Sequence, residues 1–465
     1  MRKLILLAFL YLAVTACSKK SNPDPDDDNN NGNLTAEQIR FRKIIDTSAA
    51  YSHQLYLWTS KLPENYSYSH NDLNSFMRWI RNYSIEPGFS GPVDRWSFAV
   101  VKSEWDNVSG GIAGDFGLDI FYLSNNDLRI RNIDRNGPAA TKGLKRGYRI
   151  TEINGSTNVA YSNVNAVVNA IYNSSSVNLK VVDELSNTTT VSISAATYTQ
   201  NPFALDSVYS INGKKIGYLV YNSFLGDTTQ AMNKFATVFN KFANENIDNL
   251  VIDFRYNGGG YTKLSNDLLQ YLVPSGHNGE VLTKDIFSEY FRDWDTTVAV
   301  KKKGSLNLTD LYVITGANTA SASEAVINSI KPYLNVKLIG DTTHGKPVGY
   351  FAVSVADYYI FPVSIRTINK AGSGNYFDGF APNYLAYDGV DYNWGNVNEN
   401  CFKKAIELIT GSGSGTRVNN ADQARIAANM NLFNQKLSKE NPYGNVRELD
   451  NNKLQQLRSA IEIKQ

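Results

Sequence analysis

The chain has little of the chemistry that marks a metalloprotein or a nucleotide-binding protein. Its 465 residues include only two cysteines and four histidines. The histidines are too scattered along the chain to suggest a metal site, and the paired cysteines of zinc sites are absent. No glycine-rich phosphate-binding motif is present. We therefore expect a protein that works without a metal or another cofactor.

Long apolar runs are also missing, with one short exception at the start of the chain. Arg2 and Lys3 precede an apolar run at residues 4–16, which is typical of a signal peptide and too short to span a bilayer as a helix. The run ends in Val14–Cys17 (Val-Thr-Ala-Cys), which resembles a bacterial lipobox. We expect Cys17 to be acylated and to anchor the protein in the bacterial cell envelope, on the periplasmic or the surface side of the outer membrane.

Neither sign of charge is in clear excess. Lysine and arginine number 46, and aspartate and glutamate number 44. Removing Arg2 and Lys3 with the signal peptide leaves equal numbers of the two signs. Because nucleic-acid-binding proteins carry a basic excess, this balance argues against a nucleic-acid partner.

Ser321 and Lys346 are the most informative pair in the chain. A serine hydroxyl is a poor nucleophile until a base takes its proton, and that base can be a histidine or a desolvated lysine. A lysine in water holds its proton at neutral pH, but burial in an apolar pocket lowers its pKa by several units. The pair therefore predicts a serine hydrolase with a lysine base.

Strands and helices alternate around this pair. We predict strands at residues 217–221, 250–254, 311–315 and 336–340, and helices at 228–243, 263–272 and 323–333. This alternation predicts an α/β core. Ser321 then lies at a helix N-terminus, where backbone N–H groups favour developing negative charge.

Two short motifs resemble the C-terminal processing peptidases, also called tail-specific proteases. Ser321 lies in Thr319–Glu324 (Thr-Ala-Ser-Ala-Ser-Glu), and Lys346 ends the turn Thr343–Lys346 (Thr-His-Gly-Lys). The resemblance implies a crotonase-like core with Ser321 as nucleophile and Lys346 as base. It also makes Glu324 a candidate for orienting the lysine, although a glutamate in a first helical turn is equally an ordinary helix cap.

A glycine loop supplies a third match to this family. The strand at 250–254 runs into Tyr256–Gly260 (Tyr-Asn-Gly-Gly-Gly). In the family, a loop glycine N–H and the N–H after the nucleophile form the oxyanion hole. The resemblance implies Gly259 and Ala322 for these roles, with Gly258 as the alternative glycine. A bare backbone is needed there because it must approach the scissile carbonyl closely.

A second module precedes the core. Phe116, Gly117 and Leu118 resemble the carboxylate-binding loop of PDZ domains, and residues 139–155 resemble a PDZ core. PDZ domains bind a peptide as an extra strand and hold its C-terminal carboxylate on backbone N–H groups. The resemblance implies that these three residues bind peptide. The alternative is a module that packs against the core and gates it.

We therefore expect an α/β fold in which a crotonase-like peptidase core carries an inserted PDZ-like β domain and an N-terminal helical cap. The predicted segments are a signal peptide (1–16), a lipidated cysteine with a disordered polar tether (17–33), an N-terminal helical region (34–107), the PDZ-like domain (108–196), the Ser/Lys peptidase core (205–410) and a helical C-terminal tail (411–465).

The expected function is that of a membrane-tethered serine endopeptidase. Its substrates would be proteins or peptides recognised near accessible C-termini. Three alternatives remain open: a catalytically inactive PDZ-containing binding lipoprotein, a Ser-His hydrolase that uses His344, and a structural envelope lipoprotein.

Overall fold

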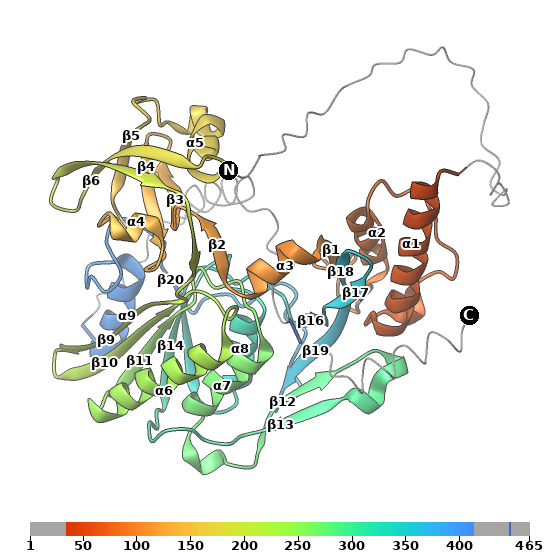
Figure 1. Ribbon diagram of the computed structural model, residues 1–465. Helices are drawn as coiled ribbons and strands as arrows, with labels where there is room; N and C mark the ends of the chain where they lie inside the picture. Colours follow the sequence, from red (N-terminus) through yellow and green to blue (C-terminus); the bar gives the residue numbers. More distant parts are fainter. Residues whose placement is uncertain (1–33, 413–445, 448–465) are drawn as a thin grey trace. The chain divides into compact units, whose positions relative to one another are not determined.

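The computed structural model describes residues 34–412 and 446–447 (Figure 1). The expected signal peptide, Cys17, the tether and most of the C-terminal tail lie outside these residues. The chain divides into two compact units, Met1–Lys43 and Ile44–Gln465, and the second contains all of the predicted catalytic and peptide-binding residues. None of the helices in the described part of the chain is long and apolar enough to cross a membrane.

The N-terminal region is mostly helical, as predicted. Helix α1 begins after a capping box, in which Thr35 and Gln38 each donate a backbone N–H to the other's side chain, at 2.8 and 3.2 Å. The region also contributes a strand that we did not predict, β1, which pairs antiparallel with β18 of the core. Its elements are α1 (Ala36–Leu55), η2 (Thr59–Lys61), α2 (Leu73–Ile80), η3 (Arg81–Tyr83), β1 (Phe98–Val101) and α3 (Lys102–Ser109).

The PDZ-like module is a five-stranded antiparallel sheet with two helices. The strand order is β3-β4-β5-β6-β7, so β3 is an edge strand. A two-stranded ribbon of β2 and β8 lies at its junction with the rest of the chain. The elements are β2 (Ile112–Asp115), β3 (Leu118–Ser124), β4 (Asp127–Ile133), α4 (Pro138–Thr141), β5 (Arg149–Ile153), η4 (Tyr161–Asn163), α5 (Val164–Tyr172), β6 (Ser176–Val182), β7 (Thr188–Ser194) and β8 (Ala196–Thr199).

The core is built on a six-stranded sheet of order β20-β15-β14-β11-β10-β9. Strands β10, β11, β14, β15 and β20 run parallel, and β9 is antiparallel to β10. The predicted strands and helices of this core are all present, with ends that move by three residues or fewer. The elements are β9 (Phe203–Ile211), β10 (Lys214–Tyr221), α6 (Thr228–Asn244), β11 (Asn249–Asp253), α7 (Thr262–Leu272), β14 (Asp310–Thr315), α8 (Ala322–Ile330), β15 (Asn335–Gly340), β20 (Tyr384–Leu385) and α9 (Asn400–Thr410).

Both faces of this sheet are covered (Figure 1). Helices α6, α7 and α8 pack on one face, where Leu219 and Ile252 point, and α9 packs on the other, where Tyr218 and Val251 point. Because successive strand residues face opposite sides, this burial explains why the strands are apolar throughout. The loops that follow the four central parallel strands meet at one edge of the sheet, where α/β proteins place their functional residues.

Two smaller sheets complete the core. One has the order β13-β12-β19-β16-β21 and the other β1-β18-β17. Their elements, with the neighbouring turns, are η5 (Ser275–His277), β12 (Val281–Ile286), η6 (Glu289–Trp294), β13 (Thr296–Ala299), β16 (Val348–Phe351), β17 (Val353–Val355), β18 (Tyr358–Phe361), β19 (Val363–Asn369) and β21 (Val446–Arg447). Four residues of the predicted helical tail are described, 411–412 and 446–447, and the last two form β21, which is a strand that pairs in parallel with β16.

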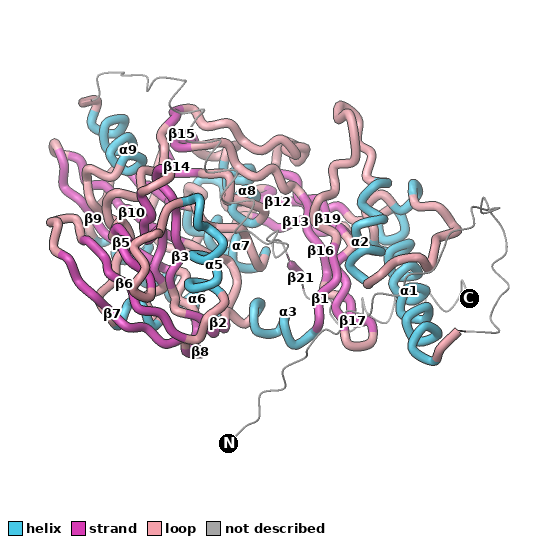
Figure 2. Tube along the Cα trace, turned by 90° about the horizontal axis from the view of Figure 1, so that it is seen from above, coloured by secondary structure: helices cyan, strands magenta, loops and turns pink. Residues whose placement is uncertain are grey.

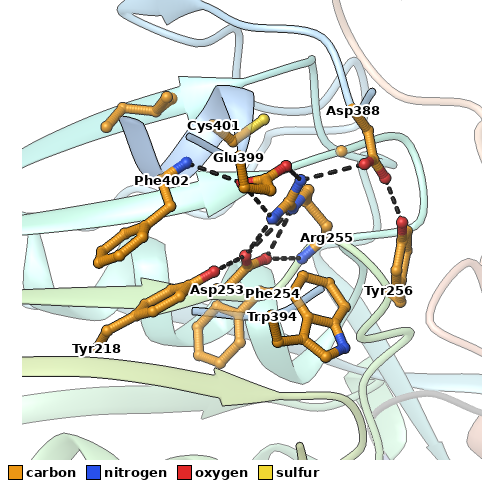
Figure 3. A network of polar contacts seen from close by, with 12 residues as sticks. Tyr218, Asp253, Phe254, Arg255, Tyr256, Asp388, Trp394, Glu399, Cys401 and Phe402 are labelled. Carbon is orange, nitrogen blue, oxygen red and sulfur yellow. Dashed lines mark hydrogen bonds and ion pairs between the residues drawn. The ribbon is translucent and has the colours of Figure 1, made fainter. Parts of the chain in front are cut away.

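A buried group of charges lies directly before the glycine loop (Figure 3). The guanidinium of Arg255 donates to Asp253 at 2.7 Å, to Glu399 at 2.7 Å and to Asp388 at 3.2 Å. All four side chains are buried. Although burial alone would raise it, the pKa of Asp388 is held well below its usual range by Arg146 and Arg255.

Arg146 brings the PDZ-like module into this group. Its side chain is buried, and it donates to Asp388 at 2.5 Å and to the Tyr256 hydroxyl at 2.8 Å. The guanidinium also stacks on the Trp394 ring, 4.3 Å from the ring centroid. The module is therefore fixed to the core by a desolvated charge.

Replacing Arg146 by methionine should lower the free energy of unfolding by about 3–5 kcal/mol, because it leaves carboxylates buried with one cation fewer. Urea denaturation measures this change. Arg129→Met is the control, since Arg129 forms a partly exposed pair with Asp127 at 2.9 Å. That substitution should cost less than about 1 kcal/mol. Equal, small effects of the two substitutions would contradict the assignment of Arg146.

Candidate active site

Ser321 lies on a sharp turn between β14 and α8. Its backbone has φ +61° and ψ −112°, a conformation that L-residues rarely adopt and that costs roughly 1–3 kcal/mol. Hydrogen bonds on either side hold the turn: Ala320 N and Ser323 Oγ both donate to the carbonyl oxygen of Asn257, at 3.1 and 3.0 Å. Ser321 Oγ is buried and has no hydrogen-bond partner among the described residues, as expected of a group that awaits a ligand.

Lys346 lies at the same edge of the sheet, just before β16. The side chain is buried, and Nζ donates a hydrogen bond to Tyr350 Oη at 3.0 Å. Nζ also lies 5.8 Å from the centre of the Trp96 ring. Burial lowers the pKa of Lys346 to about 7, even though the carboxylates of Asp94 and Glu324 act to raise it. A large fraction of Lys346 is therefore neutral at physiological pH and able to accept a proton.

Glu324 joins the turn of the serine to the turn of the lysine. Its Oε2 accepts hydrogen bonds from the backbone N–H groups of Ser321 and Lys346, at 2.9 and 2.8 Å. Its Oε1 accepts from Thr343 Oγ1 and from Gly345 N, both at 2.6 Å. Burial raises the pKa of this carboxyl, and the four hydrogen bonds lower it. Glu324 therefore links the turn of Ser321 to the turn of Lys346 through their backbone N–H groups.

The glycine loop lies against the serine turn. A Cβ on Gly259 would lie 2.8 Å from Ser321 Cβ and 3.0 Å from Ala322 N, and its φ is +102°, so only glycine fits. Ala322 is the first residue of α8, beside this glycine. The N–H of Gly259 donates to Asn257 Oδ1 at 3.0 Å, so it must leave that acceptor to bind an oxyanion.

His344 is a poor candidate for the base. Its Nε2 accepts a hydrogen bond from the indole N–H of Trp96 at 3.1 Å. Burial, together with the positive charges of Arg95 and Lys346, lowers the pKa of His344 to about 4. The imidazole is therefore neutral, and its acceptor nitrogen already has a donor.

The sequence did not reveal that the N-terminal region forms one wall of this site. Arg95 Nη2 donates to the carbonyl oxygens of His344 and Phe377, at 3.2 and 3.1 Å, and so clamps the turn that carries Lys346. Trp96 lies beside the lysine, and the buried carboxylate of Asp94 acts on its charge. Since these partners are some 250 positions apart, no local pattern connects them.

The three predicted peptide-binding residues lie together at the start of β3. The side chains of Phe116 and Leu118 are buried in the apolar core of the PDZ-like module. The N–H of Gly117 donates to Asp115 Oδ1 at 2.7 Å. In the described part of the chain, no group of three or more histidine, cysteine, aspartate or glutamate side chains is arranged to hold a metal ion.

Comparison with family models identifies both modules. Residues 215–385 match the model of peptidase family S41, and residues 99–182 match the PDZ domain model. The chain therefore contains a peptidase family S41 domain together with a PDZ domain. The S41 match contains Ser321, Lys346 and Gly259, and the PDZ match contains the loop at residues 116–118.

Two curated relatives are named as C-terminal processing enzymes. The chain is 25% identical over 288 residues to a carboxy-terminal processing protease of Bacillus subtilis (strain 168), covering 59% of this chain and 54% of the relative. It is 25% identical over 265 residues to a chloroplastic C-terminal processing peptidase of Tetradesmus obliquus, again covering 54% of each. The chain thus spans about half the length of the curated relatives that it matches.

A solved structure supports the fold. The crystal structure of an S41 protease from Bacteroides fragilis NCTC 9343 superimposes with a TM-score of 0.65, covering 80% of this chain and 97% of the other at 23% identity. The α/β fold with a PDZ domain and an N-terminal helical region is therefore confirmed.

Arg95→Ala should lower kcat for peptide cleavage by about tenfold or more while changing KM little, because small displacements of a catalytic group have large effects on rate. Steady-state kinetics with a fluorogenic peptide measures both constants. Arg78→Ala is the matched control, since Arg78 is exposed and lies 3.9 Å from Asp72. A change in KM alone would contradict the positioning role.

Proposed function

We propose that this protein is a serine endopeptidase of the cell envelope that cleaves other proteins or peptides near their C-termini through a Ser321/Lys346 dyad. The observation that carries the proposal is the buried lysine. Its pKa of about 7 makes it a base at physiological pH, and Glu324 ties its turn to that of the serine. The processing of C-termini is inferred from the names of the curated relatives.

In the proposed mechanism, neutral Lys346 first accepts the proton of the Ser321 hydroxyl. The oxygen then attacks the scissile carbonyl carbon, and the N–H groups of Ala322 and Gly259 stabilise the oxyanion. The lysine ammonium next protonates the leaving amine, which departs and leaves an ester on the serine. Neutral again, Lys346 activates the water that hydrolyses this ester.

Two rearrangements precede this chemistry. Lys346 Nζ donates to Tyr350 Oη in the present arrangement, and it must turn toward Ser321 Oγ to take its proton. The N–H of Gly259 must leave Asn257. Both are side-chain or single-peptide movements, and apo forms of hydrolases often have such loose catalytic geometry.

The alternative Ser-His hydrolase is less well supported. The acceptor nitrogen of His344 already binds the indole N–H of Trp96. Its pKa near 4 also makes the imidazole a weak proton acceptor. The inactive binding protein is disfavoured because Ser321, Lys346 and the glycine loop all lie at one edge of the sheet. No geometric feature specifically supports a structural lipoprotein.

The pH dependence of cleavage tests which base is used. Protein from residue 34 onward should cleave an unfolded reporter with a kcat/KM that rises with pH about a midpoint near 7, because the base must be unprotonated and the pKa of Lys346 is about 7. With His344 as base, the rise would be centred near pH 4. Stopped-time assays from pH 3.5 to 10 distinguish the two.

Substitutions complete this test. Ser321→Ala should abolish cleavage, and Lys346→Ala should lower kcat by about 10²–10⁴-fold. His344→Ala should retain activity within about tenfold, since it loses only the contacts of the ring with Trp96 and with the backbone of Ala317. Loss of activity in His344→Ala with retention in Lys346→Ala would reverse the assignment.

Membrane attachment is a separate part of the proposal. We infer that Cys17 is acylated after removal of residues 1–16, because it follows an apolar leader and a small residue. The polar segment at residues 17–33 would then space the enzyme from the bilayer. The lipid places the peptidase on the outer membrane.

Cys17→Ala should abolish incorporation of a labelled fatty acid and release the protein from the membrane fraction when the full chain is expressed in a bacterium with an outer membrane. The control is Cys401→Ala, because Cys401 is the only other cysteine and is buried in the core. Labelling that persists in Cys17→Ala and disappears in Cys401→Ala would contradict the proposed anchor.

A further inference from the structure

A PDZ domain accepts a peptide along an edge strand of its sheet, and β3 is such a strand here. Helix α5 lies beside β3 in both views (Figures 1 and 2). A peptide would add as a further strand along β3, with its carboxylate on the N–H groups of the loop that ends at Leu118. Each of these donors must be accessible for such a ligand to bind.

Tyr172, the last residue of α5, occupies one of these donors. Its Oη accepts the backbone N–H of Ile120 at 3.1 Å and donates to Asp119 Oδ1 at 2.6 Å. Asp119 is held in turn by Arg131, whose Nε donates to Oδ2 at 2.7 Å. The hydroxyl thus lies on the edge of β3, where the backbone of an added strand would pair.

Asp115 occupies the carboxylate loop itself. Its Oδ1 accepts the N–H of Gly117 at 2.7 Å and the hydroxyl of Tyr198 at 2.8 Å. The position of Asp115 is fixed, because it pairs with Ala196 in the β2–β8 ribbon. A carboxylate of the chain's own therefore sits where a ligand carboxylate would bind, and it would repel a second one.

We propose that this PDZ domain does not select substrates by a free C-terminal carboxylate, because Asp115 and Tyr172 fill the sites that would bind the end of a peptide. This inference deepens the proposed peptidase function, on which it rests. Substrates then enter the cleft of Ser321 near their C-termini without their terminal carboxylate being bound by the PDZ loop. A substrate whose C-terminal carboxylate is amidated is then cleaved as well as one with a free carboxylate.

Paired peptides test the proposal directly. Two fluorescent ten-residue peptides of one apolar sequence, one with a free C-terminal carboxylate and one with a C-terminal amide, are titrated with the Ser321→Ala protein by fluorescence anisotropy. The two dissociation constants should agree within about twofold. A preference of about tenfold or more for the free acid, the effect of one charge-assisted hydrogen bond, would overturn the proposal.

Two further substitutions, each made in the Ser321→Ala protein, identify the groups responsible. Asp115→Ala frees the N–H of Gly117, so the acid should then bind about tenfold more tightly than the amide. Tyr172→Phe removes only the hydroxyl, which frees the N–H of Ile120, and both peptides should then bind several-fold more tightly. Tyr148→Phe is the matched control, because the hydroxyl of Tyr148 is near the charges of Asp183 and Glu184 and takes no part in the contacts of Asp115 or Tyr172, so it should change neither constant.

The remaining outcomes are also decisive. If Asp115→Ala is folded by circular dichroism and still does not distinguish acid from amide, Asp115 is not the blocking group and the proposal fails. Because binding is measured without catalysis, this failure is independent of the peptidase function. A different result would count against the peptidase function alone. In that case both peptides bind equally well, but the unsubstituted protein cleaves neither of them.

Discussion

The buried carboxylate of Glu324 is the interaction on which the candidate site depends. A carboxylate without solvent is stable only when its lone pairs are filled, and here four donors from two separate turns fill them. Because two of those donors are the backbone N–H groups of Ser321 and Lys346, satisfying the buried charge also ties together the turns of the proposed nucleophile and the proposed base. One electrostatic requirement thus organises segments that follow different strands, β14 and β15.

Desolvation lowers the pKa of Lys346 and so makes its neutral form available as a proton acceptor. An ammonium buried among aromatic rings is disfavoured, and this lowers the pKa to about 7. Part of the surroundings of the lysine comes from the N-terminal region, since Trp96 lies over the lysine and Arg95 holds the carbonyl oxygens of its turn. The N-terminal region is therefore part of the candidate site, and the pKa of Lys346 depends on how well this region packs.

Much of the fold could be predicted from the sequence, because strands and helices of the core carry their own periodic signals. The apolar strand at residues 311–315 and the helix that begins at Ala322 are examples. The motifs also pointed to Ser321 and Lys346, whose catalytic roles stay a prediction. Contacts that depend on the folded chain could not be predicted. They are the pairing of the short strand β1 with β18, the hydrogen bond from Arg95 to the carbonyl oxygen of His344, and the hydrogen bond from the N–H of Ile120 to the hydroxyl of Tyr172. Each joins segments with no periodic relation.

The PDZ domain shows why a loop motif and its function must be considered separately. The residues at positions 116–118 form the expected loop, and a match to the PDZ model includes them. Binding of a peptide carboxylate, however, depends on backbone N–H groups, which every residue except proline carries. Whether the loop can bind a carboxylate therefore depends on whether these N–H groups already donate to another acceptor. At Gly117 and Ile120 the acceptors are side chains of the same domain.

Arg146 anchors the PDZ-like module through Asp388 to the charges that precede the glycine loop. The Arg146–Asp388 contact is buried, so breaking it would leave charged groups in the interior without a partner of equal strength. The PDZ-like module is therefore held firmly to the core, whatever it binds.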